Sequence, residues 1–257
     1  MARRALLIAT LLTAFAAPAH AEQLVVSLSN HRVAVTSNFD GEDLVLFGTI
    51  EPDRPQSAMR GTYDLVVTVT GPRHTLRTRR KDRVLGIWVN ADTREFVRVP
   101  SYLGILSNRP VNEIANAETA RRLQLGLNNF LLPQAIGPDT ADTVRDDPFR
   151  TAFVKLETQY GLYRESPIAV TFLTPTVFRV AIPMPANAPT GSYGIDVQLF
   201  GGGQPLARTQ TALEVIKAGI EQFIADAARD YGLLYGILTS LMALVIGWIG
   251  SVVFRRD

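Results

Sequence analysis

The sequence predicts a mainly β chain: an immunoglobulin-like antiparallel β-sandwich with a two-helix insertion, followed by one C-terminal transmembrane helix. Three observations lead to this fold class. Short runs of β-branched residues alternate with turn residues over much of 22–217. Segments of helical periodicity interrupt these runs at about 110–163. A charge-free apolar run occupies 231–254, which is long enough to cross a bilayer.

The first 21 residues have the three parts of a secretory signal peptide. Two arginines precede an apolar run over 5–17, and Ala19-His20-Ala21 is a small-x-small cleavage pattern. The apolar run is shorter than the ~20 residues that span a bilayer, which disfavours an uncleaved anchor. We therefore expect signal peptidase to remove residues 1–21 and Glu22 to begin the mature protein.

The strands of the sandwich are expected where β-branched runs are bounded by turn residues such as Asp40-Gly41 and Gly71-Pro72. The predicted strands are 24–28, 31–36, 43–50, 63–69, 75–80, 84–89, 95–99, 169–173, 177–182, 192–200 and 206–216. Gly201-Gly202-Gly203 is expected to turn the last hairpin. Short strands in succession, without alternating helices, favour an antiparallel sandwich over βαβ units.

The insertion at 110–163 is expected to contain two amphipathic helices. The first has apolar residues at helical spacing before Pro133 ends it, namely Ala120, Leu123, Leu127, Phe130 and Leu131. The second begins at Asp147, an N-cap followed by Pro148, and Gly161 closes it. We expect the pair to lie across the sandwich, either covering an edge strand or forming a binding surface.

The C-terminal segment predicts a membrane anchor in three parts. Residues 218–230 form a short juxtamembrane amphipathic helix, 231–254 form the transmembrane helix, and 255–257 form the tail. Arg255 and Arg256 follow the apolar run and place the tail in the cytoplasm by the positive-inside tendency. With the signal peptide, this predicts a single-pass protein of the bacterial inner membrane, with its N-terminal domain, 22–217, in the periplasm.

Small residues recur along the predicted transmembrane helix at spacings of three or four. They are Gly232, Gly236, Ser240, Ala243, Gly247 and Ser251. At about 100° per residue they share one face, which would let another helix approach closely. This helix-packing seam predicts a membrane-protein partner or self-association. The alternative is a composition effect, because glycine and serine are common in membrane helices.

The run from Arg73 to Arg83 is the strongest charge feature of the chain. In a strand, alternate residues share a face, so the positive charge would be divided between two sides. A small oxyanion or anionic lipid head groups are possible ligands of its cations, which include Arg77, Arg79, Arg80 and Lys81. An exposed edge strand protected by charge has the same sequence, and we favour that interpretation.

The composition supports no catalytic, metal or cofactor site. Cysteine is absent, which excludes thiolate chemistry, and His31 and His74 lie in different predicted strands without neighbouring ligands. An aspartate cluster over 139–147 matches no EF-hand spacing and is expected to be a solvated loop. The formal charge of +2 falls to −1 when two signal arginines and the +1 tail are subtracted. A balance so near neutral predicts no nucleic-acid partner.

Several segments carry a resemblance to a known family. They are Ser29-Asn30-His31-Arg32-Val33, Leu44-Val45-Leu46-Phe47-Gly48, Gly86-Ile87-Trp88-Val89-Asn90, Thr171-Phe172-Leu173-Thr174-Pro175-Thr176 and Phe254-Arg255-Arg256-Asp257. Over essentially the whole chain the sequence resembles the putative transmembrane protein family of alphaproteobacteria. The resemblance supplies no activity, cofactor or site residue. It implies an accessory subunit of a membrane transporter, such as a sulfite-exporter-type permease.

These features favour a non-enzymatic accessory or binding protein, anchored in the membrane and in contact with inner-membrane lipid. Two alternatives belong to other classes. An envelope enzyme acting on a glycan or lipid would need a deep pocket with two carboxylates of raised pKa. A homodimeric envelope scaffold would need a symmetric contact through the seam.

Overall fold

A computed structural model describes residues 22–36, 39–52, 63–136, 139–217, 219 and 228–253. The predicted signal peptide and the cytoplasmic tail lie outside the described residues. Of the predicted juxtamembrane helix, only Gly219 and 228–230 are described, and 228–230 are helical.

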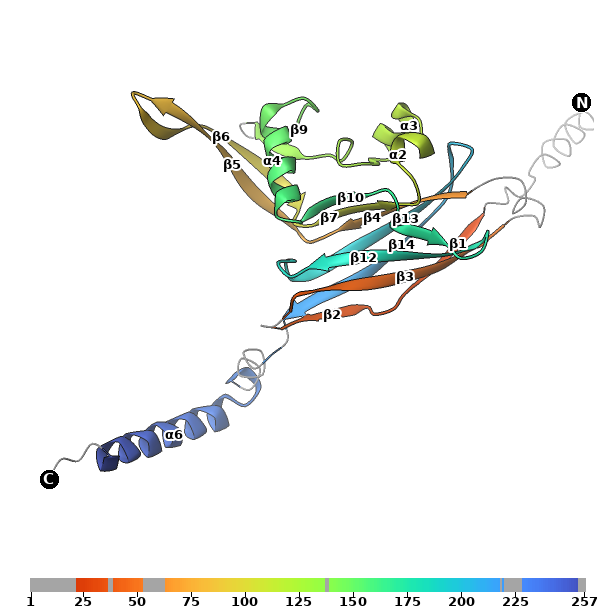
Figure 1. Ribbon diagram of the computed structural model, residues 1–257. Coiled ribbons are helices and arrows are strands. Elements are labelled where there is room, and N and C mark those ends of the chain that lie inside the picture. The colour runs from red at the N-terminus through yellow and green to blue at the C-terminus, as the bar shows by residue number, and fades with distance from the viewer. Residues whose placement is uncertain are drawn as a thin grey trace, which may run out of the picture.

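The described chain is mainly β and forms three sheets (Figure 1). The first sheet has the order β1 (Gln23–Leu28), β3 (Gly41–Glu51), β12 (Val177–Pro185) and β11 (Val170–Phe172). The second has the order β10 (Tyr163–Ser166), β7 (Leu103–Ser107), β4 (Tyr63–Thr70), β13 (Gly191–Gly201), β14 (Gln204–Lys217) and β2 (Arg32–Val35). The third has the order β5 (Arg73–Val84), β6 (Ile87–Pro100), β8 (Pro133–Ile136) and β9 (Asp139–Asp142).

The first two sheets pack face to face around one apolar core. Leu46 and Phe178 reach it from the four-stranded sheet, and Leu65 and Val197 reach it from the six-stranded sheet, all fully buried. Buried and exposed residues alternate along β12, as expected for a strand with one covered face. This burial of apolar area is the main source of stability for the fold.

The six-stranded sheet is covered on its second face as well, by the insertion and the third sheet. Val66, Ile105 and Phe200 point to this side and join Phe96 and Phe153 in a second apolar cluster. As a result β4 is buried along nearly its whole length, with no alternation. A continuous apolar strand is typical of a sheet covered on both faces.

The insertion contains α2 (Val111–Ile114), α3 (Ala117–Arg122), β8, β9 and α4 (Pro148–Gln159), so two helices are not confirmed. The first predicted helix is wrong beyond Arg122. Gln124 and Gly126 have positive φ angles of 56° and 86°, which break the helix, and of the remaining apolar residues Phe130 is buried while Leu131 is exposed.

The second predicted helix is confirmed at both ends. The Asp147 carboxylate accepts hydrogen bonds from the backbone N–H groups of Phe149 and Arg150. Pro148 occupies the first turn, and Gly161 follows the helix at φ 73°. These are the cap and stop signals that the sequence contains.

The immunoglobulin-like, wholly antiparallel sandwich is not confirmed. Two pairs are parallel, namely β10 with β7 and β14 with β2. The second arises because the chain passes from β1 in one sheet to β2 at the edge of the other, where β2 runs in the direction of β14.

The predicted strand at 84–89 is wrong, because it contains a turn. Here β5 and β6 form one long hairpin, joined through Leu85 at φ 51° and Gly86 at φ 85°. Two positive φ angles in succession are the signature of a tight hairpin turn. The register shifts between His74 and Leu76 and again between Arg80 and Lys81, and such irregularities bend a hairpin. We call residues 77–95 the arm.

The last element is α6 (Gly232–Val253). Residues Gly232–Ser251 form one candidate membrane span of 20 residues with a mean hydropathy of 2.0, and none of it is buried against the rest of the chain. At 1.5 Å per residue, 20 residues cover about 30 Å, the thickness of a bilayer core. The predicted C-terminal apolar helix is therefore confirmed.

Candidate functional site

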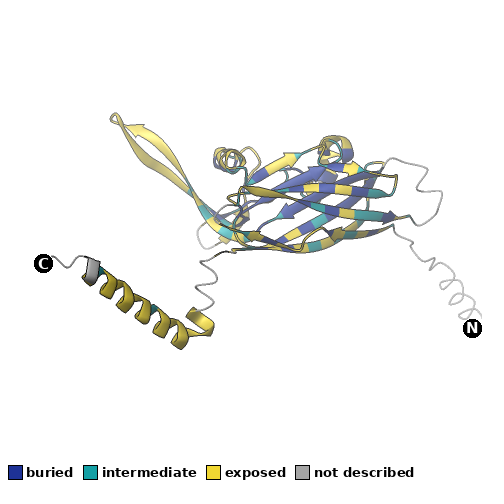
Figure 2. Ribbon diagram, turned by 60° about the horizontal axis from the view of Figure 1, so that its bottom comes forward, coloured by how far each residue is buried: buried dark blue, intermediate teal, exposed yellow. Residues whose placement is uncertain are grey.

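The arm is a long hairpin whose outer part is exposed to solvent. Figure 2 shows it leaving the body of the chain as two strands that are partly buried at the base and exposed from there to the turn. Every described residue from Arg79 to Thr93 is exposed, whereas Phe96 near the base is fully buried. The hairpin therefore consists of an anchored base and a free end.

The base of the arm is held against the first turn of α4. The guanidinium groups of Arg80 and Arg94 lie over the Phe149 ring, at 6.0 Å and 4.9 Å from its centroid. A nitrogen of Arg94 also lies 3.6 Å from a carboxylate oxygen of Asp147, the N-cap of the same helix. Cation–π and ionic contacts thus fix the point at which the arm leaves the body.

Four cations of the arm share one face of β5. The extra residues at the two register shifts belong to β6, so β5 itself alternates, and Arg77, Arg79, Lys81 and Arg83 project to the same side. Arg80 lies on the opposite face, so the charge is divided between two sides as the alternation predicts. Four cations in one row form a continuous positive strip.

Most of this strip has no carboxylate partner among the described residues. Arg77 pairs with Glu95 at 2.8 Å, and on the other face Arg80 lies 3.8 Å from Asp92. Arg79, Lys81 and Arg83 make no ion pair in the described part of the chain, although Arg83 donates to the Gly86 carbonyl at 3.3 Å. The sequence-based choice of an edge strand holds, since β5 ends its sheet.

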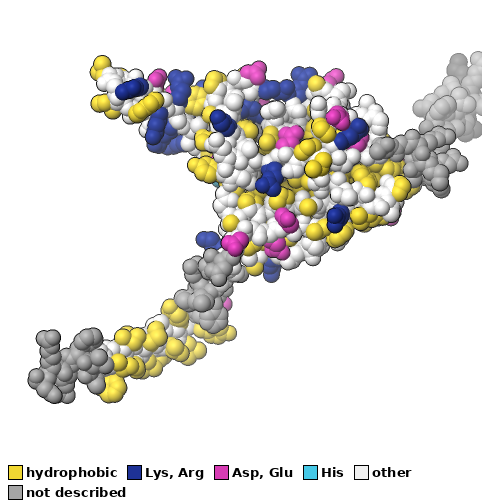
Figure 3. All heavy atoms as spheres, in the orientation of Figure 1, with side chains coloured by type: hydrophobic (Ala, Val, Ile, Leu, Met, Phe, Trp, Pro, Cys, Tyr) yellow, Lys and Arg dark blue, Asp and Glu magenta, His cyan; other side chains and the backbone are white. Residues whose placement is uncertain are grey.

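The end of the arm carries an apolar cluster that the sequence analysis missed. Its members and their exposed fractions are Val84 52%, Leu85 99%, Ile87 69%, Trp88 67% and Val89 39%. Figure 3 shows hydrophobic side chains at this end, with Lys and Arg side chains among and behind them and an acidic side chain nearby. We call these five residues the arm tip. The available signal was the Leu-Gly pair inside the run 84–89, which marks a turn and therefore an exposed end.

The predicted seam on α6 is exposed along its length. A Cβ added at Gly232, Gly236 or Gly247 would meet no neighbouring atom within 4 Å. The Ser240 hydroxyl donates to the Gly236 carbonyl at 2.8 Å, so it is satisfied within the helix. Within the described residues nothing from the sandwich covers this face, and the structure brings none of the arm residues onto it.

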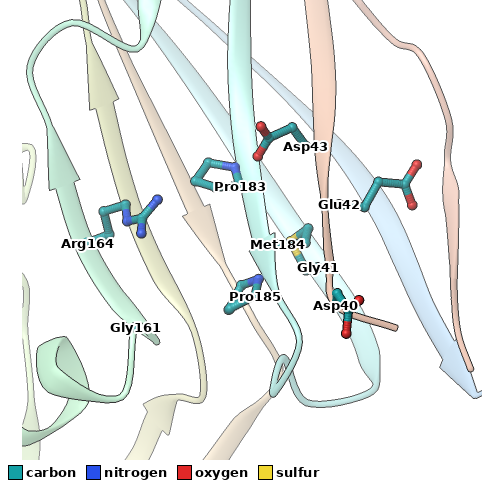
Figure 4. Close-up of a pocket in the computed structure, with 9 residues that line it drawn as sticks. All are labelled: Asp40, Gly41, Glu42, Asp43, Gly161, Arg164, Pro183, Met184 and Pro185. Carbon is teal, nitrogen blue, oxygen red and sulfur yellow. The ribbon is translucent and has the colours of Figure 1, made fainter. Parts of the chain in front are cut away.

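A shallow groove lies between the two sandwich sheets near Gly41 (Figure 4). It encloses about 320 Å³ and is lined by Arg164 of β10 and by Asp40, Glu42 and Asp43 beside or within β3. Glu42 extends away from the other labelled side chains. Glu157, whose pKa is raised by burial, does not line this groove.

The buried polar groups elsewhere have structural roles. Asp64 is almost completely buried, and its carboxylate accepts from the side chains of Asn108 and Arg109. Burial raises the pKa of Tyr102 to about 12, and its hydroxyl donates to the Pro183 carbonyl at 2.6 Å. Among the described residues, no group of three or more His, Cys, Asp or Glu side chains is placed to hold a metal.

A family model described as putative transmembrane protein (Alph_Pro_TM) matches residues 23–256. The chain belongs to this family. The match covers the sandwich, the arm and α6 together, so all three are parts of one family architecture. This membership agrees with the resemblance noted in the sequence, and it makes the chain a membrane-associated protein with α6 as its candidate span.

Other comparisons add little. No curated protein matches the chain. One similar solved structure is the N-terminal domain of the Streptococcus gordonii adhesin Sgo0707, with 7% sequence identity and a TM-score of 0.28. The match covers 76% of this chain and 32% of the adhesin chain. A similarity at this level supports no conclusion about the function of this chain.

Proposed function

We propose that this member of the Alph_Pro_TM family is a non-enzymatic accessory protein that binds another integral membrane protein through α6. In this proposal α6 crosses the inner membrane, the sandwich lies in the periplasm, and the C-terminus lies in the cytoplasm. The signal-like start and the arginines after the apolar run support this orientation. A membrane transporter, such as a sulfite-exporter-type permease, is the partner that the family resemblance favours.

The seam is the observation that carries this proposal. An anchor alone needs only apolar residues, but α6 places small residues at three- and four-residue spacings on one face about 100° wide. Nothing in the described chain occupies the space beside Gly236 and Gly247. In lipid, helices associate by close van der Waals packing, so a face without side chains gives a second helix the closest approach.

The test changes two glycines of the seam while keeping the membrane insertion of α6. Gly236→Leu with Gly247→Leu puts branched side chains where a partner helix would pack, while leucine favours membrane insertion. The matched control is Leu238→Ile with Leu241→Ile, on the opposite side of the helix and also exposed. Interhelical contacts contribute about 1 kcal/mol each, so the double glycine variant should weaken the complex about tenfold or more.

Crosslinking yield in native membranes, followed by mass spectrometry of the captured protein, measures the effect. The proposal expects a membrane protein to be captured by the native chain and the control, and lost with the glycine variant. Capture of a second copy alone would instead favour the homodimeric scaffold. Equal crosslinking yields for the glycine variant and the control would show that the small residues do not form a helix contact and only reflect the composition of membrane helices. That result would overturn the proposal.

A further inference from the structure

The arm and the membrane anchor leave the sandwich at the same end. Thr70 at the end of β4 pairs with Gly194 of β13, which pairs in turn with Ala212 of β14. Both β4 and β14 run antiparallel to β13, so they run parallel to each other. The arm follows β4, and the connection to α6 follows β14. Figure 1 shows the arm leaving on the side where β14 ends.

The lengths of the two connections allow the arm tip to reach the bilayer. Residues 218–231 join Lys217 to α6, and 14 residues span at most about 50 Å. The β5 half of the arm runs from Arg77 to Val84, and at about 3.4 Å per residue it extends about 27 Å. The arm therefore covers about half of the greatest distance that the connection permits, and a less extended connection brings the arm tip to the bilayer.

The apolar side chains of the arm tip project to both faces of the hairpin. Register pairs share a face, so Val84 and Ile87 project to one side, while Trp88 lies opposite Arg83 on the other. Leu85 extends at the turn itself, fully exposed. A hairpin that docked flat on a protein would present one apolar face. Exposed apolar side chains on both faces and at the turn itself fit an apolar medium that the hairpin enters end-on.

Charge immediately behind the tip complements an anionic surface. The arm holds six cations and three carboxylates, a net charge of +3. Lys81 and Arg83 lie on the Trp88 face, with Arg83 directly opposite Trp88, and neither makes an ion pair in the described chain, whereas Asp82 lies opposite Val89 on the other face. Lys81 and Arg83 thus follow the apolar turn, and Trp88 lies level with Arg83, which matches the order of acyl chains, interface and head groups.

We propose that the arm tip inserts end-on into the anionic surface of the membrane that holds α6. The chain then contacts the bilayer twice, once through its span and once through the arm. Insertion is shallow, because beyond Phe96 the outer edges of β5 and β6 have no strand partner among the described residues. Backbone groups without partners are excluded from the hydrocarbon core, so the tip stops at the head-group and acyl boundary.

The two tryptophans of the chain make this contact measurable. They are Trp88 in the arm tip and Trp248 in α6. Full-length Trp248→Phe therefore carries a single tryptophan, which lies at the proposed contact. The protein is reconstituted without any partner into vesicles of phosphatidylcholine and phosphatidylglycerol, with or without bromine on the upper acyl carbons. We expect bromine to quench Trp88, and acrylamide in the water to quench it little.

Two variants separate the apolar and ionic contributions. Leu85→Glu with Ile87→Glu should abolish bromine quenching, because carboxylates oppose entry into the acyl region. Lys81→Gln with Arg83→Gln should shift the tip from lipid to water by about fivefold for each cation, and only in vesicles that contain phosphatidylglycerol. The matched control is Ile168→Glu with Leu173→Glu, which changes two exposed apolar residues flanking β11. In this control, bromine should quench Trp88 as strongly as in the parent protein.

Each contrary result overturns the inference. Trp88 that acrylamide quenches and bromine does not would place the tip in water. Blue-shifted Trp88 emission without bromine quenching would place it against protein, including a second copy of the chain. Bromine quenching that survives the glutamate variant would mean that the tip does not direct the contact. Because no partner is present in these vesicles, any of these outcomes leaves the proposed role of the α6 seam untouched.

Discussion

The sandwich and the arm are built from the same kind of strand but place their apolar residues in opposite environments. In β4, Leu65, Val66 and Val67 are completely buried. At the arm tip, Leu85, Ile87 and Trp88 are at least two-thirds exposed. Strand propensity alone therefore does not separate a residue that stabilises the fold from one that is available for contact.

What differs is the number of neighbours that the fold gives each strand. Strand β4 is paired on both edges, by β13 and β7, and is covered on both faces. The arm strands pair with each other and, beyond Phe96, with no further strand in the described chain. Burial of apolar area is what stabilises, so we expect the same chemical change to have very different costs in the two regions.

The largest expected difference is between two aromatic truncations. Phe178→Ala removes a fully buried ring from the sandwich core and should lower the free energy of unfolding by about 3–5 kcal/mol. Trp88→Ala removes a larger but exposed ring and should change it by less than about 0.5 kcal/mol. Urea unfolding of the full chain in detergent, followed by circular dichroism, measures both. Similar costs would show that the arm packs on the body.

A second contrast compares two carboxylates. Asp64→Ala removes the buried acceptor of Arg109 and Asn108 and should cost about 2–3 kcal/mol, limited because Arg109 is partly exposed. Asp92→Ala removes an exposed partner of Arg80 and should cost no more than about 1 kcal/mol. The same urea titrations apply. A cost at Asp92 equal to that at Asp64 would contradict the separation of the two regions.

The third contrast is alkaline pH, which acts on the sandwich and not on the arm. Tyr102 is buried, and its pKa is raised to about 12 from an ordinary value of 10.0. The folded state thus keeps a proton that the unfolded chain loses. The stabilising effect is complete below pH 10 and is lost between pH 10 and 12, at about 1.4 kcal/mol per pH unit. Stability measured from pH 9 to 12 should fall less steeply in Tyr102→Phe.

Much of the sandwich follows from local sequence signals. The alternation in β12, the turn after β13 and the Asp147-Pro148 helix start all appear as expected. Strand β7 was missed, because its residues are buried on both faces and the run is only five residues long. A short apolar run without alternation does not distinguish a strand from a helix.

Of the candidate site, the cations of β5 were predicted from the sequence but the apolar arm tip was not. Alternation along β5 placed Arg77 and Arg79 on one face, and the structure agrees. The apolar tip was hidden because 84–89 has strand composition, so its residues were expected in the sheet. Only the pairing of Val84 with Ile87 shows that the chain reverses there. Whether an apolar run is covered depends on its tertiary neighbours, which a single sequence does not specify.

The most direct test is to remove the outer part of the arm and measure whether the free energy of unfolding of the protein changes. Because Arg80 pairs with Asp92, residues 81–91 can be replaced by Asn-Gly, a two-residue hairpin turn. If the arm serves contact and not folding, the full-length shortened chain should keep its free energy of unfolding within about 0.5 kcal/mol. A loss of more than about 2 kcal/mol, or loss of cooperative unfolding, would contradict the account, because the arm would then be part of the stabilising structure.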